Sequence, residues 1–169
     1  TFGKAESDVA PATQGPATAT STSDVTMRGG GLFNAGVLTL RQVKVTGNTL
    51  TGTGTASAIA GEDATSATAT ATIVVRLLGG GIYNEGSLTL ERSTISGNSV
   101  AATAEATALA VVDAGSGVTV HANPYAVVAA GIYNKGGLYL RESTVSGNGV
   151  TSSLKSSATT GGGAPVTDS

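Results

Sequence analysis

The sequence predicts an all-β fold, a parallel β-solenoid in which each coil of the chain stacks on the one before. Three observations predict it. One motif recurs at 29–48, 79–98 and 129–148, so that position i of one copy matches position i+50 of the next. Apolar and polar residues alternate with a period of two, and Gly and Asn recur at the same turn positions. We therefore expect one domain over 1–169, with coil 1 at about 1–50, coil 2 at 51–100, coil 3 at 101–150 and a partial fourth coil at 151–169.

Composition excludes several classes of function. The 169 residues include 25 Gly and no Cys, and the formal net charge is −2. The lack of Cys excludes disulfides and thiolate metal sites, and the small acidic charge argues against nucleic acid as a partner. No apolar run reaches the roughly 18 residues of a membrane-spanning helix, so we expect no membrane insertion. Richness in Thr, Ser, Ala and Gly suits a secreted bacterial surface protein, and we interpret Thr1 as the start of a processed chain.

Within the motif, apolar residues alternate with polar ones, the pattern of a strand with one buried face. In the second copy Leu88 and Leu90 alternate with Ser and Thr, and Ile95 lies between Thr and Ser. Gly86 predicts a turn before the first strand, and Gly97 predicts one after the second. The matching apolar residues of the other copies are Leu38, Leu40, Val45, Leu138, Leu140 and Val145.

Between the motifs, the same alternation predicts two longer strands in each coil. From Leu50 onward the even positions carry Gly, Ala or an apolar residue, and most odd positions carry Thr or Ser. After a turn at 61–64, the run TSATATATIVVRLL at 65–78 reverses this parity. Sheets lined by Ala and Gly approach more closely than the usual ~10 Å, so we expect a thin, flat wing beside a fuller core of Leu, Ile and Val.

Charged residues favour one long coil per repeat of the motif over two shorter coils. Positions i and i+50 then stack about 4.8 Å apart, where opposite charges stabilise and like charges destabilise. In four such columns every charged neighbour has the opposite sign. The columns are Arg41, Glu91 and Arg141; Gln42, Arg92 and Glu142; Ala35, Glu85 and Lys135; and Thr55, Glu105 and Lys155.

Asparagine and aromatic residues recur at the same spacing, and we interpret them as structural ladders. A turn Asn can hydrogen-bond the equivalent Asn of the next coil and satisfy backbone groups of the turn. The ladders are Asn34, Asn84 and Asn134; Asn48, Asn98 and Asn148; and Phe33, Tyr83 and Tyr133. An active site needs one copy of its residues, whereas every coil needs the same corner, so the repetition favours a structural role.

The segment GGGIYNEGSLTLERSTISGN at 79–98 resembles the repeat of right-handed parallel β-helix proteins of bacterial cell surfaces. It is also similar to the GGA(I/L)–FxxN repeats of polymorphic outer-membrane proteins and autotransporter adhesins. The resemblance implies a right-handed parallel β-helix and an extracellular stalk, adhesin or matrix protein. It covers the three copies of the motif and none of the chain between them. Coils of that family are usually much shorter than the coil expected here, so the resemblance implies nothing about the wing.

Some β-helix proteins are polysaccharide lyases or hydrolases, whose reactions need clustered carboxylates, often around Ca²⁺, with a basic residue beside them. Here the acids are scattered, and one weak candidate for a cation site stands at the wing-tip turns, namely Glu62, Asp63 and Asp113. His121 is the single His, in a column with Ser21 and Ala71 that should face the interior. We expect no catalytic residue, cofactor or metal, and a degenerate lyase-like protein stays the enzymatic alternative.

Threonine ranks suggest a different alternative. The threonines at 18, 20 and 22 align with those at 68, 70 and 72, and this array resembles the ice-binding faces of antifreeze β-solenoids. At a spacing of 50 the next row carries Val118, Val120 and Ala122, which would interrupt the array. Outward Thr is also simply favoured in strands, and exposed Thr and Ser could equally carry O-linked glycans. An ice-binding β-solenoid therefore stays an alternative.

The two ends of the predicted solenoid suggest self-assembly. Natural solenoids cap their ends with atypical elements, yet no cap is evident here. The one feature that could weaken pairing at an end is the set of charged residues Lys4, Glu6 and Asp8, at positions that carry Gly and Ala one period later. Open edges invite another copy to continue the stack, and such head-to-tail contacts generate filaments.

We therefore expect a non-catalytic extracellular structural protein that forms a head-to-tail homopolymer in a surface appendage or matrix. Its partners would be further copies of itself, together with cell-surface glycans or host or abiotic surfaces. A fragment of a longer β-helical adhesin is the alternative that uses the same end surfaces.

Overall fold

The computed structural model describes the backbone of residues 2–8 and all atoms of 15–61, 65–112 and 117–161. These residues form sixteen strands, every pairing between them is parallel, and no helix occurs among them. None of the described residues therefore lies in a helix of the length and apolarity that crossing a bilayer needs. The protein is a parallel β-helix, as the sequence predicts.

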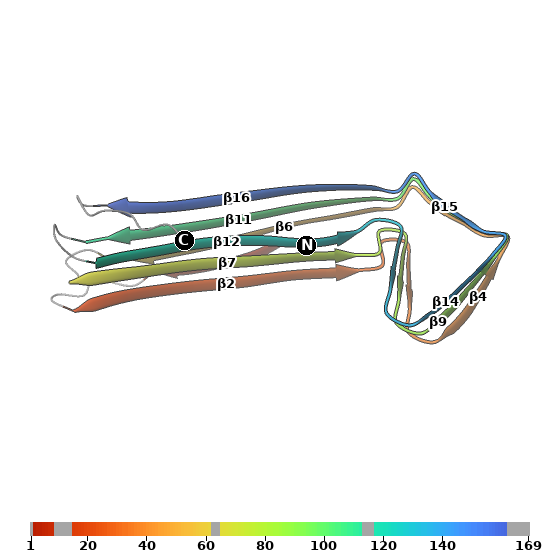
Figure 1. Cartoon of the computed structure of the whole chain (residues 1–169), viewed down its shortest axis with the longest axis horizontal. Coiled ribbons are helices and arrows are strands. Elements are labelled where there is room, and N and C mark those ends of the chain that lie inside the picture. The colour runs from red at the N-terminus through yellow and green to blue at the C-terminus, as the bar shows by residue number, and fades with distance from the viewer. Residues whose placement is uncertain (1, 9–14, 62–64, 113–116, 162–169) are drawn as a thin grey trace.

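Two long sheets face each other and form the wing (Figure 1). The first wing sheet has the order β1, β6, β11, β16, and the second has the order β2, β7, β12. The strands of the first are β1 (Phe2–Asp8), β6 (Thr49–Ala60), β11 (Ser99–Val111) and β16 (Gly149–Gly161). The strands of the second are β2 (Pro16–Arg28), β7 (Ser66–Leu78) and β12 (Gly117–Ala129).

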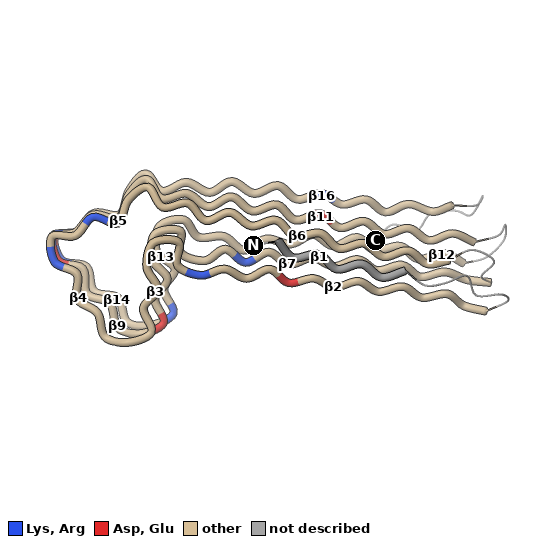
Figure 2. Tube along the Cα trace, turned by 180° about the vertical axis from the view of Figure 1, so that it is seen from behind, with Lys and Arg blue, Asp and Glu red and all other residues tan. Residues whose placement is uncertain are grey.

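Three short sheets form a head at one end of the wing (Figure 1). The first contains β3 (Leu32–Asn34), β8 (Ile82–Asn84) and β13 (Ile132–Asn134); the second contains β4 (Val37–Arg41), β9 (Ser87–Glu91) and β14 (Gly137–Arg141); the third contains β5 (Lys44–Thr46), β10 (Thr94–Ser96) and β15 (Thr144–Ser146). In the view of Figure 2 the charged residues gather on the head and on the adjoining part of the wing.

The strand register confirms that one coil spans one full repeat of the motif. Residue i pairs with residue i+50 between β6 and β11, between β11 and β16, between β2 and β7, and throughout the head sheets. In β11, for instance, Glu105 lies between Thr55 and Lys155. A two-coil repeat would pair residues at half that separation, which these sheets do not do.

Strand β12 departs from this register by one residue. Gly117 pairs with Ser66 and Ala129 with Leu78, an offset of 51. The head registers are unchanged, because three residues separate β7 from β8 whereas two separate β12 from β13. Gly79, which opens the longer corner, has φ +73, and a Cβ there would lie 2.2 Å from the Ile82 carbonyl oxygen. The third coil has Ala where such a glycine is needed, and it turns the corner with one residue fewer.

Two expectations about this strand are therefore wrong. Val118 and Val120 are buried on the inner face, where they pair with Ala67 and Ala69, so they do not interrupt the outer threonine ranks. His121 pairs with Thr70 and is half-buried on the outer side, whereas the spacing of 50 placed it inside.

Strand β1 also pairs with an offset of 51, from Phe2 opposite Thr53 to Asp8 opposite Ile59. Lys4, Glu6 and Asp8 therefore stand opposite Thr55, Ser57 and Ile59. The expectation that these three charges occupy the columns of Gly54, Ala56 and Ala58 is wrong. The three charged residues are instead in register with polar or exposed positions of β6.

The core has two parts, as the sequence suggests. In the wing, burial alternates residue by residue along β7 and β11, and the inner positions carry mainly Ala with a few larger side chains. The larger ones lie opposite glycine, since a Cβ at Gly52 would lie 2.7 Å from Leu77 and one at Gly54 would lie 2.5 Å from Ile73. In the head, the buried aliphatic cluster consists of Ile82, Leu88, Leu90 and Ile95.

Candidate functional site

The first asparagine ladder lies at the turn between the first two head sheets. Asn34 Nδ2 donates to Asn84 Oδ1 at 2.7 Å, and Asn84 Nδ2 donates to Asn134 Oδ1 at 2.6 Å. Asn84 also donates to the carbonyl oxygens of Gly86 at 3.1 Å and Gly137 at 2.9 Å, and its side chain is fully buried. The ladder therefore ties each turn to the turn of the next coil, and the buried Asn84 amide bonds to other protein groups rather than facing a ligand.

The second asparagine ladder lies where the head meets β6, β11 and β16. Asn48 Nδ2 donates to Asn98 Oδ1, and Asn98 Nδ2 donates to Asn148 Oδ1, both at 2.8 Å. Asn98 Nδ2 also donates to the Val45 carbonyl at 3.0 Å. Between the asparagine side chains of both ladders, each amide donates to the next asparagine toward the C-terminus, so these side-chain hydrogen bonds run in one direction along the solenoid axis.

An aromatic column stands beside the first ladder. The rings of Phe33, Tyr83 and Tyr133 stack with centroids 5.2 Å apart at each step. The Tyr83 hydroxyl donates to Glu85 Oε1 at 2.7 Å, and Lys135 Nζ lies 3.5 Å from the same oxygen. The hydrogen bond from Tyr83, followed by the charges of Lys135 and Arg28, lowers the pKa of Glu85. Glu85 is therefore held as a carboxylate and is unsuited to act as a general acid near neutral pH.

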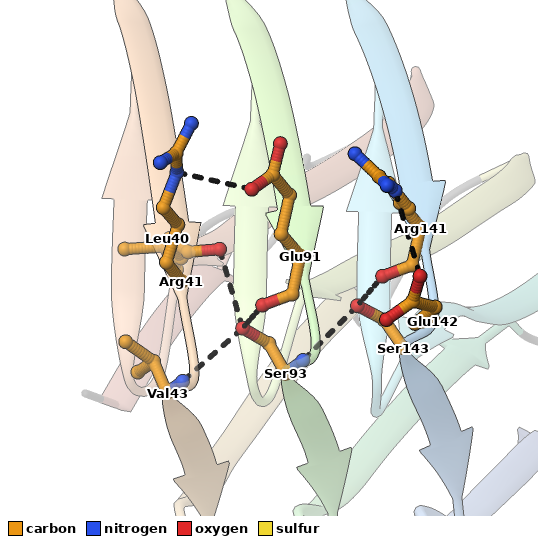
Figure 3. Close-up of polar contacts among 8 residues, drawn as sticks. All are labelled: Leu40, Arg41, Val43, Glu91, Ser93, Arg141, Glu142 and Ser143. Carbon is orange, nitrogen blue, oxygen red and sulfur yellow. Dashed lines mark hydrogen bonds and ion pairs between the residues drawn. The ribbon is translucent and has the colours of Figure 1, made fainter.

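Two of the four charge columns, that of Arg41, Glu91 and Arg141 and that of Gln42, Arg92 and Glu142, run along the corner between the second and third head sheets (Figure 3). Arg41 Nε lies 3.0 Å from Glu91, while Arg141 Nε lies 3.6 Å from Glu142 of its own coil. Gln42, Arg92 and Glu142 adopt positive φ values of 56, 48 and 48°, which turn the chain at this corner. With Glu91 and Arg141, the last two line a small polar hollow of about 180 Å³.

Not all predicted columns form ion pairs. Glu105 and Lys155 are in register, as are Glu91 and Arg141, but neither pair approaches within 4 Å in the part of the chain that the structure describes. These charges are exposed or half-buried, and exposed ion pairs contribute only about 0–1 kcal/mol. The columns therefore avoid repulsion more than they add stability.

Two polar features were not predicted from the sequence. Ser93 Oγ accepts from the Val43 amide, and Ser143 Oγ accepts from the Ser93 amide, both at 3.1 Å, which forms a serine ladder in the head (Figure 3). The two serines share a column in the sequence, but the first copy of the motif has Val43 at that position, so the residue type does not recur in all three copies. The ion pair between Asp24 and Arg76 joins positions that share no column, so columns of equivalent residues could not find it.

No catalytic constellation emerges from the described residues. They contain no group of three or more His, Cys, Asp or Glu side chains able to hold a metal ion. The candidate cation site, Glu62, Asp63 and Asp113, lies outside the described residues. His121 has Thr70 and Thr119 as its nearest register neighbours on the outer face, with no carboxylate among them.

The two ends of the stack are the most unusual surfaces. We call the edge formed by β2–β5 the lower end and the edge formed by β12–β16 the upper end. At the upper end Leu138, Leu140 and Val145 are 37%, 46% and 44% exposed. Their middle-coil counterparts, Leu88 and Ile95 among them, are 1% exposed or less. The upper end is thus a cross-section through the core rather than a finished surface.

No family model, curated protein or solved structure matches this chain. The resemblance to bacterial surface β-helices therefore stays a prediction that rests on the recurring motif alone.

Proposed function

We propose that this protein is a non-catalytic, extracellular structural protein whose copies stack head-to-tail, the upper end of one on the lower end of the next. The observation that carries the proposal is the uncovered core of the upper end. The half-buried Leu38, Leu40 and Val45 of the lower end stand in the same columns as the exposed Leu138, Leu140 and Val145. A second copy moved by three coils along the axis would bring these matching residues together, with its first coil on the third coil of the first copy.

The ladders support the same partner. Asn134 and Asn148 end the two asparagine ladders at the upper end, with Nδ2 groups that, in the middle coil, reach the next asparagine. Asn34 and Asn48 begin the ladders at the lower end. A head-to-tail junction would continue both ladders in the same direction, and the Tyr133 ring would cover the half-exposed Phe33 ring. A partner of different sequence would lack these matched columns.

The magnitudes indicate that strand pairing has to contribute. Five apolar side chains at the upper end are about half exposed, namely Leu138, Leu140, Val145, Val150 and Leu154. Covering them is worth about 4–7 kcal/mol, if a full burial of each is worth about 1.5–3 kcal/mol. Association costs about 4–15 kcal/mol in lost freedom. Apolar burial alone therefore falls near or below the cost, and the backbone edges must pair as well.

A glycine at the lower end offers a test that leaves the isolated chain intact. A Cβ at Gly86 would lie 2.0 Å from the Gly36 carbonyl, and one at Gly136 would lie 1.9 Å from the Gly86 carbonyl. The same vector at Gly36 meets nothing within 4 Å, because no coil lies below. Gly36→Ala should therefore fold normally and block stacking, since the new methyl would strike the Gly136 carbonyl of the preceding copy, whose upper end would meet this lower end.

The matched control is Gly117→Ala at the wing tip, where a Cβ also meets nothing within 4 Å and where Ser66 already carries a Cβ in the same column. Electron microscopy over a dilution series is the measurement. Wild type and the Gly117 variant should form fibres with a subunit rise of about 15 Å, which is three coils at ~4.8 Å, while the Gly36 variant should stay monomeric. Fibres of the Gly36 variant equal to wild type would refute the junction. Monomers of all three would favour a segment of a longer adhesin, in which further coils of the same chain cover these ends.

Ice binding is the second candidate, and the register of β12 favours it. Thr119, His121 and Asn123 continue the outer rows of Thr18–Thr68, Thr20–Thr70 and Thr22–Thr72, so the polar array extends over three coils. Thr20→Lys in this sheet, with Thr103→Lys in the other wing sheet as its control, separates the readings. Thermal hysteresis that is lost only in the first variant would support an ice-binding face, and an absence of hysteresis in the wild-type chain would reject it.

A further inference from the structure

The two wing sheets differ in strand number, and this difference bears on how a junction forms. The first wing sheet has four strands, whereas the second wing sheet and each head sheet have three. The extra strand arises because the chain both enters and leaves through the first wing sheet, by β1 at one edge and by β16 at the other.

Head-to-tail stacking cannot accommodate both edge strands. At a junction, β2 of the next copy would add to β12, and its head strands would add to β13, β14 and β15. In the first wing sheet, only one strand fits between β11 of one copy and β6 of the next. Two strands would compete for that position in the sheet. One is β16, which already pairs with β11, and the other is the next copy's β1, which already pairs with that copy's β6.

Resting on the proposed stacking, we infer that β1 is a removable cover of β6, and that each junction forms by strand exchange in which β16 of one copy displaces β1 of the next. The partner is a second copy of this chain, and the surface it takes is the edge of β6. Until exchange occurs, β1 protects that edge from indiscriminate pairing, a protection that exposed sheet edges generally require.

The pairing of the two strands favours β16 as the final occupant. In the described residues β1 pairs with β6 over seven residues, Thr53–Ile59, whereas β11 pairs with β6 over all twelve, Thr49–Ala60, and β16 in the continued register would do the same. A strand that pairs along nearly twice the length makes more ladder hydrogen bonds. It also continues the offset of 50 that β11 makes with β6, whereas β1 holds β6 at an offset of 51.

Side-chain volume points the same way. Opposite Gly54, Ala56 and Ala58, strand β1 places only Gly3, Ala5 and Ser7. In the continued register, β16 would place Leu154 opposite Gly54 and Val150 opposite Leu50. Both side chains are about half exposed at the upper end, Leu154 at 51% and Val150 at 49%, so exchange would cover apolar surface that a single copy leaves exposed to water.

The path of the exchange follows from where β1 lies. Within the described residues, β1 pairs with Thr53–Ile59, so the head-proximal part of β6 at 49–52 lies outside that pairing. Head docking would extend the second asparagine ladder from Asn148 to Asn48 and would set Gly149 beside Thr49. β16 would then pair with β6 from the head toward the wing tip and displace β1 along the way.

A disulfide that fixes β1 to β6 tests the exchange in the full chain. Lys4 and Thr55 are register partners, and neighbouring strands lie about 4.8 Å apart, within the span that a disulfide bridges. The chain has no other Cys. Oxidised Lys4→Cys/Thr55→Cys should yield at least tenfold less fibre than its reduced form. The matched control, Thr103→Cys/Ser153→Cys, fixes β16 to β11, a pairing that the exchange leaves intact, and it should assemble equally when oxidised and reduced.

The outcomes separate the inference from the stacking proposal. Full assembly of the oxidised Lys4/Thr55 variant would overturn strand exchange and leave stacking in place. If wild type itself stays monomeric, Ala5→Pro/Glu6→Pro decides. Successive amide groups of a strand point to opposite edges, so one of these two prolines must remove a donor facing β6. Fibres of this variant alone would support β1 as the cover, whereas continued monomers would overturn both proposals.

Discussion

Asn84→Ala should destabilise the folded chain far more than the equivalent change one coil later. The Asn84 side chain is fully buried; its Oδ1 accepts from Asn34, and its Nδ2 group has three acceptors, Asn134 and the carbonyls of Gly86 and Gly137. An amide has two N–H groups, so at most about three full hydrogen bonds form, and at about 1 kcal/mol each the loss in the free energy of unfolding is about 3 kcal/mol.

Asn134→Ala is the matched control, because Asn134 occupies the same turn but is exposed. Its loss removes the bonds to Asn84 and to the Gly136 carbonyl, both of which water can replace, so we expect a cost of about 1 kcal/mol. Urea denaturation followed by circular dichroism, at a concentration where the chain is monomeric, measures both variants. A difference between them of less than about 1 kcal/mol would refute the idea that the buried ladder stabilises the head.

Three further predictions concern single positions. Gly79→Ala should lower the free energy of unfolding by at least about 2 kcal/mol, because the φ of +73 and the 2.2 Å distance from a Cβ to the Ile82 carbonyl oxygen both disfavour a side chain there. The control Gly117→Ala should change the free energy of unfolding by less than about 0.5 kcal/mol. Equal urea midpoints for the two variants would contradict the strain expected at Gly79. The lowered pKa of Glu85 contributes stability that is present above its ordinary value of 4.5 and is lost as the pH falls through the folded-state value. Glu85→Gln should therefore show a smaller drop in urea midpoint between pH 7 and pH 3 than wild type, and an unchanged drop would exclude this carboxylate as a source. Stacking would place Arg141 beside Arg41 of the next copy, so fibre formation should increase between about 0.05 and 0.5 M salt as the repulsion between the two arginines is screened. Arg41→Gln should weaken this salt dependence, which light scattering measures. A salt dependence that is the same in Arg41→Gln and wild type would argue against this junction.

The coil length and the strand faces followed from the sequence because they depend on local alternation and on a strict repeat. The columns of Asn84, Tyr83 and Glu91 lie where the period of 50 places them, since the head has the same number of residues in every coil. The alternation along β11 likewise matches its burial pattern.

The offsets of β12 and β1 could not be predicted from a constant period. A residue added at the wing tip of the third coil and one removed at its corner cancel in the numbering of the next motif, so the repeat looks unbroken. One signal was present: Ala129 and Ala130 replace two glycines of the earlier corners, and Ala cannot easily adopt the positive φ of Gly79. The ion pair of Asp24 with Arg76 could not be predicted from the sequence, because the two residues are diagonal neighbours on adjacent strands and are neither close in the chain nor in one column.

The alternation of Ala and Thr in the wing has a consequence for how the fold tolerates change in length. In β7 and β11 the inner positions near the wing tip are small, as at Ala69, Ala106 and Ala108, so sliding these strands by two residues there would exchange like for like. This part of the wing therefore contributes little to the alignment of the strands, which depends on the head, with its asparagine and aromatic columns, and on the large residues packed opposite Gly52 and Gly54. Insertions or deletions of paired residues could lengthen or shorten the wing in steps of about 6.6 Å while the head stays unchanged, which makes wing width a freely adjustable dimension of the molecule.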